Sequence, residues 1–445
     1  MIKLVLPPTP LASNLTSTLV VQVASKAVDS KLSLERGDRG ELYASIDVDV
    51  NEFAEILRQV LDELKPVGVS GRLPLVPGRG PGTDGRTISS LLGRQISLRA
   101  EKRVEIFEGL ANIVKSRGAG VVSELSSLLV DVGRDGVYKL CLGGCDHLVP
   151  VVVKSDAFYE IGRFGGASDR RRSGQPKFGR VEYRASTSYT ALLYALVLAL
   201  QSGYESGTNS YMFTSMQLEP GTITSPQAAV ASQLYKRLSE NIRRVGLQVW
   251  SQDYEGLRLA ALLWLVAGYH KMLRESLAYG YPENLAFNLT VMSATGNRFY
   301  TLWSTSISFA ETDASLRALE TLAEELEADV YKVANYAAIL IASTLKLCSG
   351  QTGGSVNDLW QGVKMLAYAL LTGSKHMIFD TLYRLLRLLD DPHTGLQSSL
   401  TNAVLSTANT IGVRIDDVLP EGGEEKDRGR AVWRALKKLV ESLIM

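Results

Sequence analysis

Apolar residues recur at helical spacing throughout the last third of the chain. From about Glu311 onward this spacing predicts helices and no strands. The breaks between the predicted helices are short, which is typical of helices that pack side by side in a bundle. We expect helices at residues 313–329, 330–347, 356–371, 375–389, 396–411 and 428–444.

The first part of the chain mixes strand and helix patterns. Residues 42–50 alternate as a strand does, and residues 51–64 carry an apolar helical face made by Phe53, Ile56, Leu57, Val60, Leu61 and Leu64. Pro66 ends that helix. Residues 66–86 are so rich in Pro and Gly that we predict a long exposed loop.

Further elements follow this loop in a mixed order. Residues 87–116 and 121–129 read as helices, and the apolar runs 138–142 and 148–153 predict a hairpin closed by residues 143–147. After Arg184 we expect helices at 187–201, 227–245 and 255–279, a strand at 211–218, and strands at 286–292 and 298–309 joined by the turn Ala294-Thr295-Gly296-Asn297.

Taken together, these patterns predict an α+β fold. We expect a mixed N-terminal domain with small antiparallel sheets at residues 1–186, a helical segment with an inserted β-hairpin at 187–310, and an all-α helical bundle at 311–445. The length of 445 residues agrees with two or three domains, and 45% apolar with 21% charged residues is typical of a folded protein.

The charge is sorted along the chain, although its net value is only +1. Between Pro66 and Arg184 there are 19 Lys and Arg against 12 Asp and Glu, whereas acidic stretches lie at residues 311–329 and 416–427. An excess of one sign in one region indicates a charged partner, and phosphate is the commonest partner of a basic region.

The cellular location of the protein is predicted from three kinds of pattern that are missing from the sequence. The longest apolar runs, residues 191–200 and 260–268, are shorter than the ~20 residues of a membrane span, and no signal peptide is recognisable. Three cysteines are too few for a disulfide framework in a chain of this size, which favours a reducing compartment. We therefore expect a cytoplasmic protein that does not contact a membrane.

The strongest candidate for a binding segment is residues 162–184, where seven Lys and Arg face two acids. Guanidinium groups pair with phosphate oxygens, aromatic faces stack on unpaired bases, and glycines let the backbone approach closely. The alternative is a solvated charged loop. In the binding interpretation the phosphate contacts are Arg163, Arg170, Arg171, Arg172, Lys177, Arg180 and Arg184, and the stacking or wedging residues are Phe164 and Phe178.

A second basic set begins in the Pro/Gly loop and continues along the chain: Arg72, Arg79, Arg86, Arg94, Arg99, Lys102 and Arg103. Arg99 and Arg103 are four residues apart and would share a helix face that tracks a nucleic-acid strand. The alternative is an ordinary solvent face on which Glu101 and Glu105 are the local partners.

Catalytic and metal-binding patterns are weak. Cys141, Cys145 and His147 do not match a common zinc spacing, so core cysteines beside a turn are the preferred interpretation. Residues 78–85 lack the ending of a P-loop, and no metalloprotease or nucleophile-elbow motif occurs. Asp131, Asp135 and Lys139 faintly suggest a metal-dependent nuclease, although Gly133 and Gly136 favour a plain turn. We expect a non-enzyme without cofactor or metal.

Two stretches and the general organisation suggest a family. The apolar helix 188–201 that runs into Tyr211-Met212-Phe213, and the helix Ile378-Phe379-Asp380-Thr381-Leu382-Tyr383-Arg384-Leu385-Leu386, together with basic N-terminal loops and a helical C-terminal bundle, resemble the large subunit of archaeal type I CRISPR Cascade effector complexes, particularly subtype I-A. The paired Cys-x-x-Cys zinc motif of some branches of that family is absent from this chain.

This resemblance implies a protein that joins a crRNA-containing ribonucleoprotein. It would sense the protospacer-adjacent motif in duplex DNA, help to open the R-loop by holding a single strand, and dock a separate helicase-nuclease without cutting DNA itself. Two alternatives remain open. One is a scaffold protein that packages nucleic acid, as in an archaeal virus, and the other is a nuclease at Asp131 and Asp135.

Overall fold

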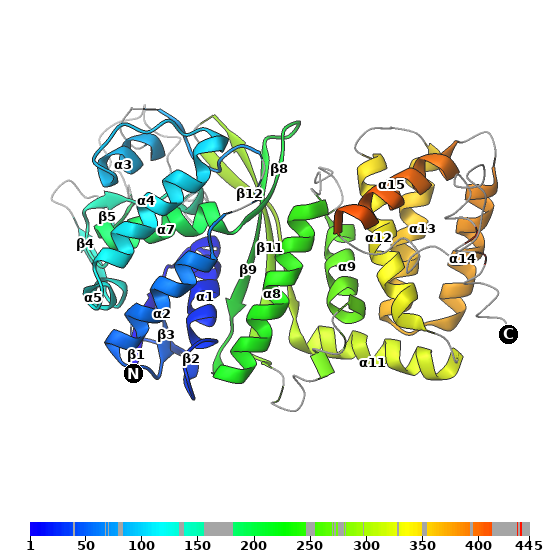
Figure 1. Ribbon diagram of the computed structural model, residues 1–445, viewed down its shortest axis with the longest axis horizontal. Coiled ribbons are helices and arrows are strands. Elements are labelled where there is room, and N and C mark those ends of the chain that lie inside the picture. The colour runs from blue at the N-terminus through cyan, green and yellow to red at the C-terminus, as the bar shows by residue number, and fades with distance from the viewer. Residues whose placement is uncertain are drawn as a thin grey trace, which may run out of the picture. The chain divides into compact units, whose positions relative to one another are not determined.

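The computed structural model describes residues 1–38, 41–66, 68–69, 71–78, 83–132, 138–154, 181–245, 254–268, 270, 273–274, 280, 282–296, 298–326, 329–348, 354–391, 395–411, 434 and 437. The chain folds into two compact units. Unit 1 comprises residues 1–235 and 282–306, and unit 2 comprises residues 236–281 and 307–445. Unit 1 mixes helices with three sheets and unit 2 is helical, so the fold is α+β, as predicted (Figure 1).

The first sheet of unit 1 has the order β1-β3-β2-β10, with every neighbouring pair antiparallel. Its strands are β1 (Ile2–Leu6), β2 (Lys31–Arg36), β3 (Leu42–Ile46) and β10 (Gly221–Thr224). Helix α2 (Val50–Glu63) follows β3, and the Asp49 side chain caps it by accepting hydrogen bonds from the backbone N–H groups of Asn51 and Glu52. The predicted apolar face of α2 is buried, which confirms this element.

The second sheet has the order β12-β11-β9-β8. Its strands are β8 (Gln201–Glu205), β9 (Ser210–Leu218), β11 (Leu285–Thr295) and β12 (Arg298–Ser308), and the predicted turn at residues 294–297 does join β11 to β12. Helix α1 (Pro10–Ala24) packs on β9, where the Thr18 hydroxyl accepts a hydrogen bond of 2.7 Å from the backbone N–H of Met216. Residues on every face of α1 are buried.

The third sheet corrects a predicted pairing. Its order is β4-β5-β7-β6, formed by β4 (Leu128–Val132), β5 (Tyr138–Leu142), β7 (Val181–Ala185) and β6 (His147–Leu148). The predicted hairpin of residues 138–142 with 148–153 is wrong, because β7 lies between those segments, parallel to β5 and antiparallel to β6. After β6 the chain turns into a helix at residues 151–154, where the carbonyl of Pro150 accepts from Val153 and Lys154.

The helices beside this sheet are shorter than predicted. The expected helix 87–116 is divided into α3 (Asp84–Leu91), the 3-10 helix η1 (Ala100–Lys102) and α4 (Arg103–Ser116). Gly93, with φ of +63°, follows the end of α3 in the left-handed conformation that favours glycine. Likewise α5 (Gly120–Leu125) stops early because the residues after it pair with β5 as strand β4.

Helix α7 (Thr187–Ala199) is the central helix of unit 1 and packs against both α4 and α1 (Figure 1). Ser186 caps it by accepting a hydrogen bond from the backbone N–H of Tyr189. Every residue of α7 after Thr187 is buried. The predicted domain boundary at residue 186 therefore falls inside unit 1, where α7 belongs to the same core as the N-terminal elements.

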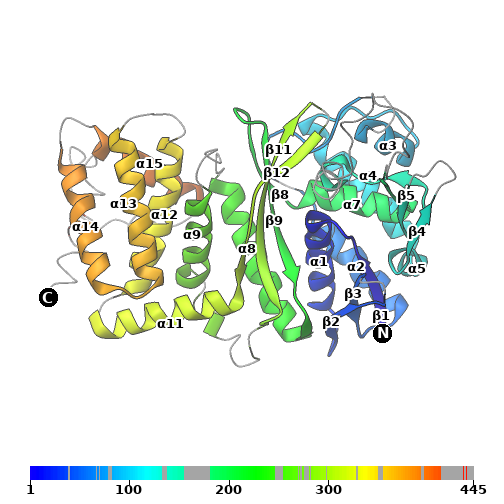
Figure 2. The same ribbon diagram turned by 180° about the vertical axis from the view of Figure 1, so that it is seen from behind.

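Unit 2 is helical and contains the residues of the predicted bundle, 311–445, together with residues 236–281, which were predicted to belong to the middle segment (Figure 2). Its described elements are α9 (Glu255–Leu263), the π-helix η2 (Trp264–Gly268), α11 (Phe309–Leu326), α12 (Val330–Cys348), α13 (Gly354–Leu371), α14 (Lys375–Asp390) and α15 (Leu396–Ile411), while α8 (Ser225–Val245) begins in unit 1 and ends in unit 2. Gly256 of α9 lies directly against the buried indole of Trp360 in α13. The predicted helix 428–444 lies outside the described residues, apart from Arg434 and Lys437.

Within the part of the chain that the structure describes, no helix has the length and apolarity that a membrane span requires. The longest described helices, such as α8 and α12, contain charged residues within their sequences.

Candidate nucleic-acid interface

The structure describes five of the fourteen predicted nucleic-acid contacts, namely Arg72, Arg86, Arg99, Arg103 and Arg184. The other nine lie outside the described residues: Arg79, Arg163, Phe164, Arg170, Arg171, Arg172, Lys177, Phe178 and Arg180. All fourteen belong to unit 1 by residue number. Two of the five described contacts differ from the prediction in their surroundings.

Arg103 is a buried structural residue rather than a surface cation. Only 2% of it is exposed, and its guanidinium donates to Gln201 Oε1 at 2.7 Å. The same group donates to the carbonyl oxygens of Gly71 and Arg72, at 3.1 and 3.3 Å. A guanidinium satisfied in this way inside the protein is not available to a phosphate, so the predicted role of Arg103 is corrected.

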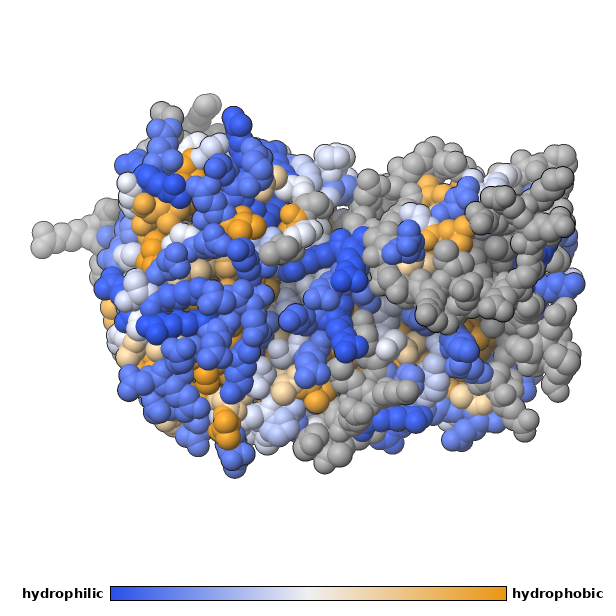
Figure 3. Space-filling model, viewed as in Figure 1, coloured by the Kyte–Doolittle hydropathy of each residue, from blue (hydrophilic) through white to orange (hydrophobic). Residues whose placement is uncertain are grey.

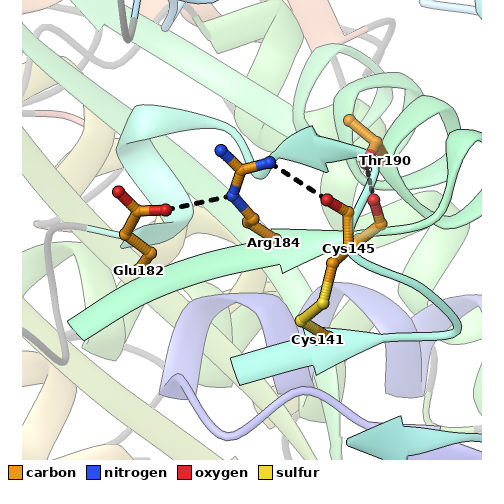
Figure 4. Close-up of a disulfide and its surroundings, with 6 residues drawn as sticks. Cys141, Cys145, Glu182, Arg184 and Thr190 are labelled. Atoms are coloured by element: carbon orange, nitrogen blue, oxygen red, sulfur yellow. Dashed lines mark hydrogen bonds and ion pairs between the residues drawn. A yellow bond between two sulfur atoms is a disulfide. The ribbon is translucent and has the colours of Figure 1, made fainter. Parts of the chain in front are cut away.

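Arg184 is also held by its own protein (Figure 4). Its Nε donates to Glu182 Oε2 at 3.1 Å, and its Nη1 donates to the carbonyl oxygen of Cys145 at 3.0 Å. About a third of the Arg184 side chain is exposed, 32%. This arginine therefore links strand β7 to the turn after β5, and its contact with phosphate stays a prediction.

Cys141 and Cys145 form a disulfide, which corrects the expectation of two unpaired core cysteines (Figure 4). Cys141 is fully buried in β5, and Cys145 lies in the turn that follows, with 5.0 Å between the two Cα atoms. The third cysteine, Cys348, is free and buried. Among the described residues, no group of three or more His, Cys, Asp or Glu side chains is placed to hold a metal ion.

The disulfide provides a first prediction. Replacing Cys145 by Ser is expected to lower the free energy of unfolding by about 2 kcal/mol, because the bond closes a short loop in the unfolded chain. Urea unfolding without and with a thiol reductant measures this effect. The difference in unfolding free energy between the wild type and Cys145→Ser should appear only without reductant. The difference between the wild type and Cys348→Ser, the control, should be the same with and without reductant, because both proteins keep the bond. An equal decrease in both conditions would contradict the bond.

Three of the seven cations of the second basic set are paired with acids close by in the sequence. Arg94 and Lys102 both contact Glu105, at 2.8 and 2.6 Å, and Arg99 lies 3.9 Å from Glu101. These pairs match the alternative of an ordinary solvent face that the sequence left open. Hydrophilic side chains cover much of the unit 1 face seen in Figure 3.

Arg72 and Arg86 differ from their neighbours. Both side chains are exposed, and neither has a carboxylate partner among the residues that the structure describes. Arg72 follows Gly71 in the Pro/Gly loop, and Arg86 lies in the first turn of α3. These two remain the described cations of the predicted interface that are open to an anionic partner.

Asp84, at the start of α3, connects the two basic segments. Its Oδ2 accepts a hydrogen bond of 2.7 Å from the backbone N–H of Val76 in the first loop. Its Oδ1 accepts from the backbone N–H of Val151, at 3.0 Å, and from the hydroxyl of Tyr194 in α7, at 2.7 Å. The end of the first basic loop and the approach to the second are therefore fixed to one carboxylate.

Asp84 is 1% exposed, and burial raises the pKa of its carboxyl from 3.8 to about 6, against the opposing effect of its three hydrogen bonds and of nearby Lys154. The same burial, with the Asp84 charge beside it, raises the pKa of the Tyr194 hydroxyl well above its ordinary value. Sequence reasoning missed Asp84 because Thr83-Asp84-Gly85 has the appearance of a turn.

The chain before and after the second basic segment is joined by the pairing of β6 with β7. The chain enters residues 155–180 after Lys154 and returns at Val181, the first residue of β7. Around these points the backbone N–H of Val149 donates to the carbonyl of Tyr183 at 3.3 Å, and β6 pairs with β7. Asp84 holds the same corner through Val151. Six of the predicted contacts and both predicted aromatic residues belong to this segment.

The structure gives little support to the alternative of a metal-dependent nuclease. Asp131 of β4 lies opposite Lys139 of β5 in the antiparallel pairing, and Asp135 lies outside the described residues. This register places the acid and the lysine side by side on two strands. It does not add a second acid to them.

Comparison with known proteins gives no relative for this chain. No protein-family model matches it, and no curated protein matches its sequence. Its function is therefore argued from its residues and their arrangement.

Proposed function

We propose that this protein is a non-catalytic, cytoplasmic nucleic-acid-binding protein that uses the two basic segments of unit 1. The observation that carries the proposal is Asp84, which binds Val76 in the first basic segment and Val151, which precedes the second one in the chain. Two stretches that are distant in the sequence and that share a cationic excess are thereby linked through described residues beside them. A phosphate backbone is the partner that such a concentration of positive charge fits.

The molecular role that we propose is the large subunit of a crRNA-guided DNA surveillance complex. In that role these segments sense a short motif in duplex DNA, a separate surface holds the opened single strand, and the bundle of unit 2 offers a docking surface to a helicase-nuclease. The support is the order of the chain, with basic loops in a mixed first unit and a helical second unit. Cutting is assigned to the docked enzyme.

The proposal predicts salt-sensitive binding that depends on Arg170, Arg171 and Arg172. Replacing all three by Ala is expected to weaken binding of duplex DNA and to reduce the slope of log K against log salt by about 0.9 for each phosphate that is no longer neutralised. Fluorescence anisotropy of a labelled duplex measures both quantities. A salt range of about 50 to 200 mM suits it, because a protein with roughly 6–10 phosphate contacts weakens by about 10³ or more over that range.

A matched control removes two exposed cations of unit 2. Arg317 and Arg384 pair with Asp313 and Asp380 on their own helices, and their replacement by Ala should leave binding unchanged. The proposal fails if the triple variant of the full chain binds with unaltered affinity and slope, both alone and assembled with its partner subunits.

A further inference from the structure

The Cys141–Cys145 disulfide lies beside Arg184, one of the predicted phosphate contacts. Strand β7 runs parallel to β5, and the register of this pair puts Arg184 opposite Cys141. The Arg184 guanidinium donates to the carbonyl oxygen of Cys145 at 3.0 Å and to Glu182 Oε2 at 3.1 Å (Figure 4). The disulfide and the arginine therefore meet at one backbone carbonyl, that of Cys145.

The two cysteines differ in how firmly the fold holds them. Cys141 is fully buried within β5, whereas Cys145 is half-buried in the turn between β5 and β6. That turn is attached on either side of Cys145. The backbone N–H of Gly143 donates to the carbonyl just before β4 at 2.7 Å, and Asp146 accepts from the backbone N–H of the first residue of α7 at 3.2 Å. At Cys145 itself the S–S bond ties the turn to the buried strand.

We infer that the Cys141–Cys145 bond is a redox switch that decides whether Arg184 contacts a nucleic-acid phosphate. In the oxidised protein the carbonyl of Cys145 holds the guanidinium. In the reduced protein Cys145 moves, and the guanidinium binds a phosphate oxygen instead. Arg184 follows the predicted contact Arg180 by four residues, so its release adds one cation to the second basic segment. The inference rests on the proposed function, to which it adds regulation.

Reduction of the bond begins at Cys145, the more accessible of the two residues. One thiolate of a dithiol attacks the Cys145 sulfur, and the Cys141 sulfur leaves as a thiolate that takes up a proton. The second thiol of the reductant then attacks the mixed disulfide and releases Cys145. Two electrons and two protons pass to the protein, which gains two thiols, while the dithiol is oxidised to its own disulfide. A cytoplasmic protein, as proposed above, is exposed to such reductants.

The loss of the bond changes the position of the Cys145 carbonyl. Two thiol sulfurs need more room than one S–S bond, because unbonded sulfur atoms separate to van der Waals contact. Cys141 is enclosed in the core, so Cys145 is the residue that moves. Arg184 Nη1 then needs another acceptor, and phosphate accepts a stronger, charge-assisted hydrogen bond than a neutral carbonyl does. Glu182 still accepts from Nε, which keeps the guanidinium close to β7.

The first experiment measures the release of Arg184 without nucleic acid. The full-length protein is treated with phenylglyoxal, which modifies free guanidinium groups, in its oxidised form and after reduction by dithiothreitol and removal of that reagent without air. Peptide mass spectrometry should find Arg184 modified roughly tenfold faster in the reduced form, because a hydrogen bond to a charged group no longer holds it. Arg58, an exposed cation in α2, is the internal control and should react at one rate in both forms.

The oxidation state is verified by counting thiols in the denatured chain, three when reduced and one when oxidised. Equal rates at Arg184 in the two forms overturn the switch. A bond that dithiothreitol does not reduce in the folded protein also overturns it.

The second experiment measures the phosphate contact by fluorescence anisotropy of a labelled duplex. Reduction of the wild type is expected to steepen the slope of log K against log salt by about 0.9, the effect of one further phosphate contact. Cys145→Ser should show the steeper slope with and without reductant, and Arg184→Gln the shallower slope in both. Cys348→Ser, the control, keeps the bond and should respond to reductant as the wild type does.

The possible results separate the inference from the proposed function. If the oxidised and reduced proteins bind duplex DNA with one slope, while replacement of Arg170–Arg172 weakens binding, this inference alone is overturned. A change of slope that persists in Arg184→Gln overturns Arg184 as the switched contact. If neither form binds DNA, the proposed function and the phosphate contact fall together. The comparison of the two wild-type forms needs no substitution, so it decides the question even where a variant fails to fold.

Discussion

The Arg103→Met variant is expected to unfold with a free energy about 1–3 kcal/mol below that of the wild type. The methionine keeps the apolar stem and removes the guanidinium. The carbonyl oxygens of Gly71 and Arg72 are then without a buried donor, and so is Gln201 Oε1. A buried acceptor left without its donor costs far more than the hydrogen bond contributed when it was made. Urea unfolding followed by circular dichroism measures the decrease in stability.

Arg99→Met is the matched control for this experiment. Arg99 lies four residues earlier, its side chain is 73% exposed, and its contact with Glu101 is long at 3.9 Å. Its replacement should change the free energy of unfolding by no more than about 0.5 kcal/mol. If Arg103→Met instead unfolds like the wild type and loses only nucleic-acid affinity, Arg103 is a contact residue and its structural assignment is wrong.

The stability of the protein is expected to contain a contribution from Asp84 that falls by about 3 kcal/mol as the pH rises from about 4 to about 7. The pKa of this carboxyl is about 6 in the folded protein and 3.8 when unburied. Between those values the folded state binds more protons than the unfolded state, so stability decreases with rising pH. Well above the folded-state pKa both states are ionised, and the contribution of Asp84 no longer changes.

Asp84→Asn isolates this contribution, because the amide does not titrate. The unfolding free energy of the wild type minus that of Asp84→Asn should decrease by about 3 kcal/mol between about pH 4 and pH 7. The other titrating groups contribute equally to both proteins, so their effects cancel in this difference. Asp47→Asn, which removes a carboxylate that is 71% exposed, is the control for an Asp-to-Asn change at the surface. A difference for Asp84→Asn that does not change with pH would contradict the raised pKa of Asp84.

The amphipathic helices were predictable because one physical cause dominates them. Helix α2 has a single apolar face over Phe53, Ile56 and Val60, and it begins and ends within one residue of the prediction. The helices α11 to α15 of unit 2 were found in the same way. Helix α1 was not predicted, because it is buried on all sides and its pattern has no polar face to set the period.

The third sheet was not predictable from local pattern. Strands β5 and β6 lie close in sequence, which favours a hairpin, but the strand between them, β7, comes more than thirty residues later. No sequence pattern near β5 or β6 indicates that β7 lies between them in the sheet. The disulfide was missed for a related reason, because cysteines four residues apart suit a turn, a metal site and a bond equally well in sequence.

The sequence indicated the residue types and charges of the candidate site, but not which of its side chains are buried or where they lie. Spacing of four residues put Arg99 and Arg103 on one predicted face, whereas in the structure Arg103 is buried and Arg99 is exposed. Helix α4 begins only at Arg103, so the two do not share a helix. Charge and residue type do not tell which cation turns inward. That depends on Gln201 and the loop carbonyls, which meet Arg103 only after folding.

The pairing of β6 with β7 has a consequence for how this protein can diverge. Doubling the length of chain between two fixed points costs only about 0.6 kcal/mol of closure entropy. The register of β5, β6 and β7 is set by the residues of the strands themselves. A change in the length of the chain between β6 and β7 is therefore expected to cost this sheet little free energy, so that length is free to vary among relatives of this protein.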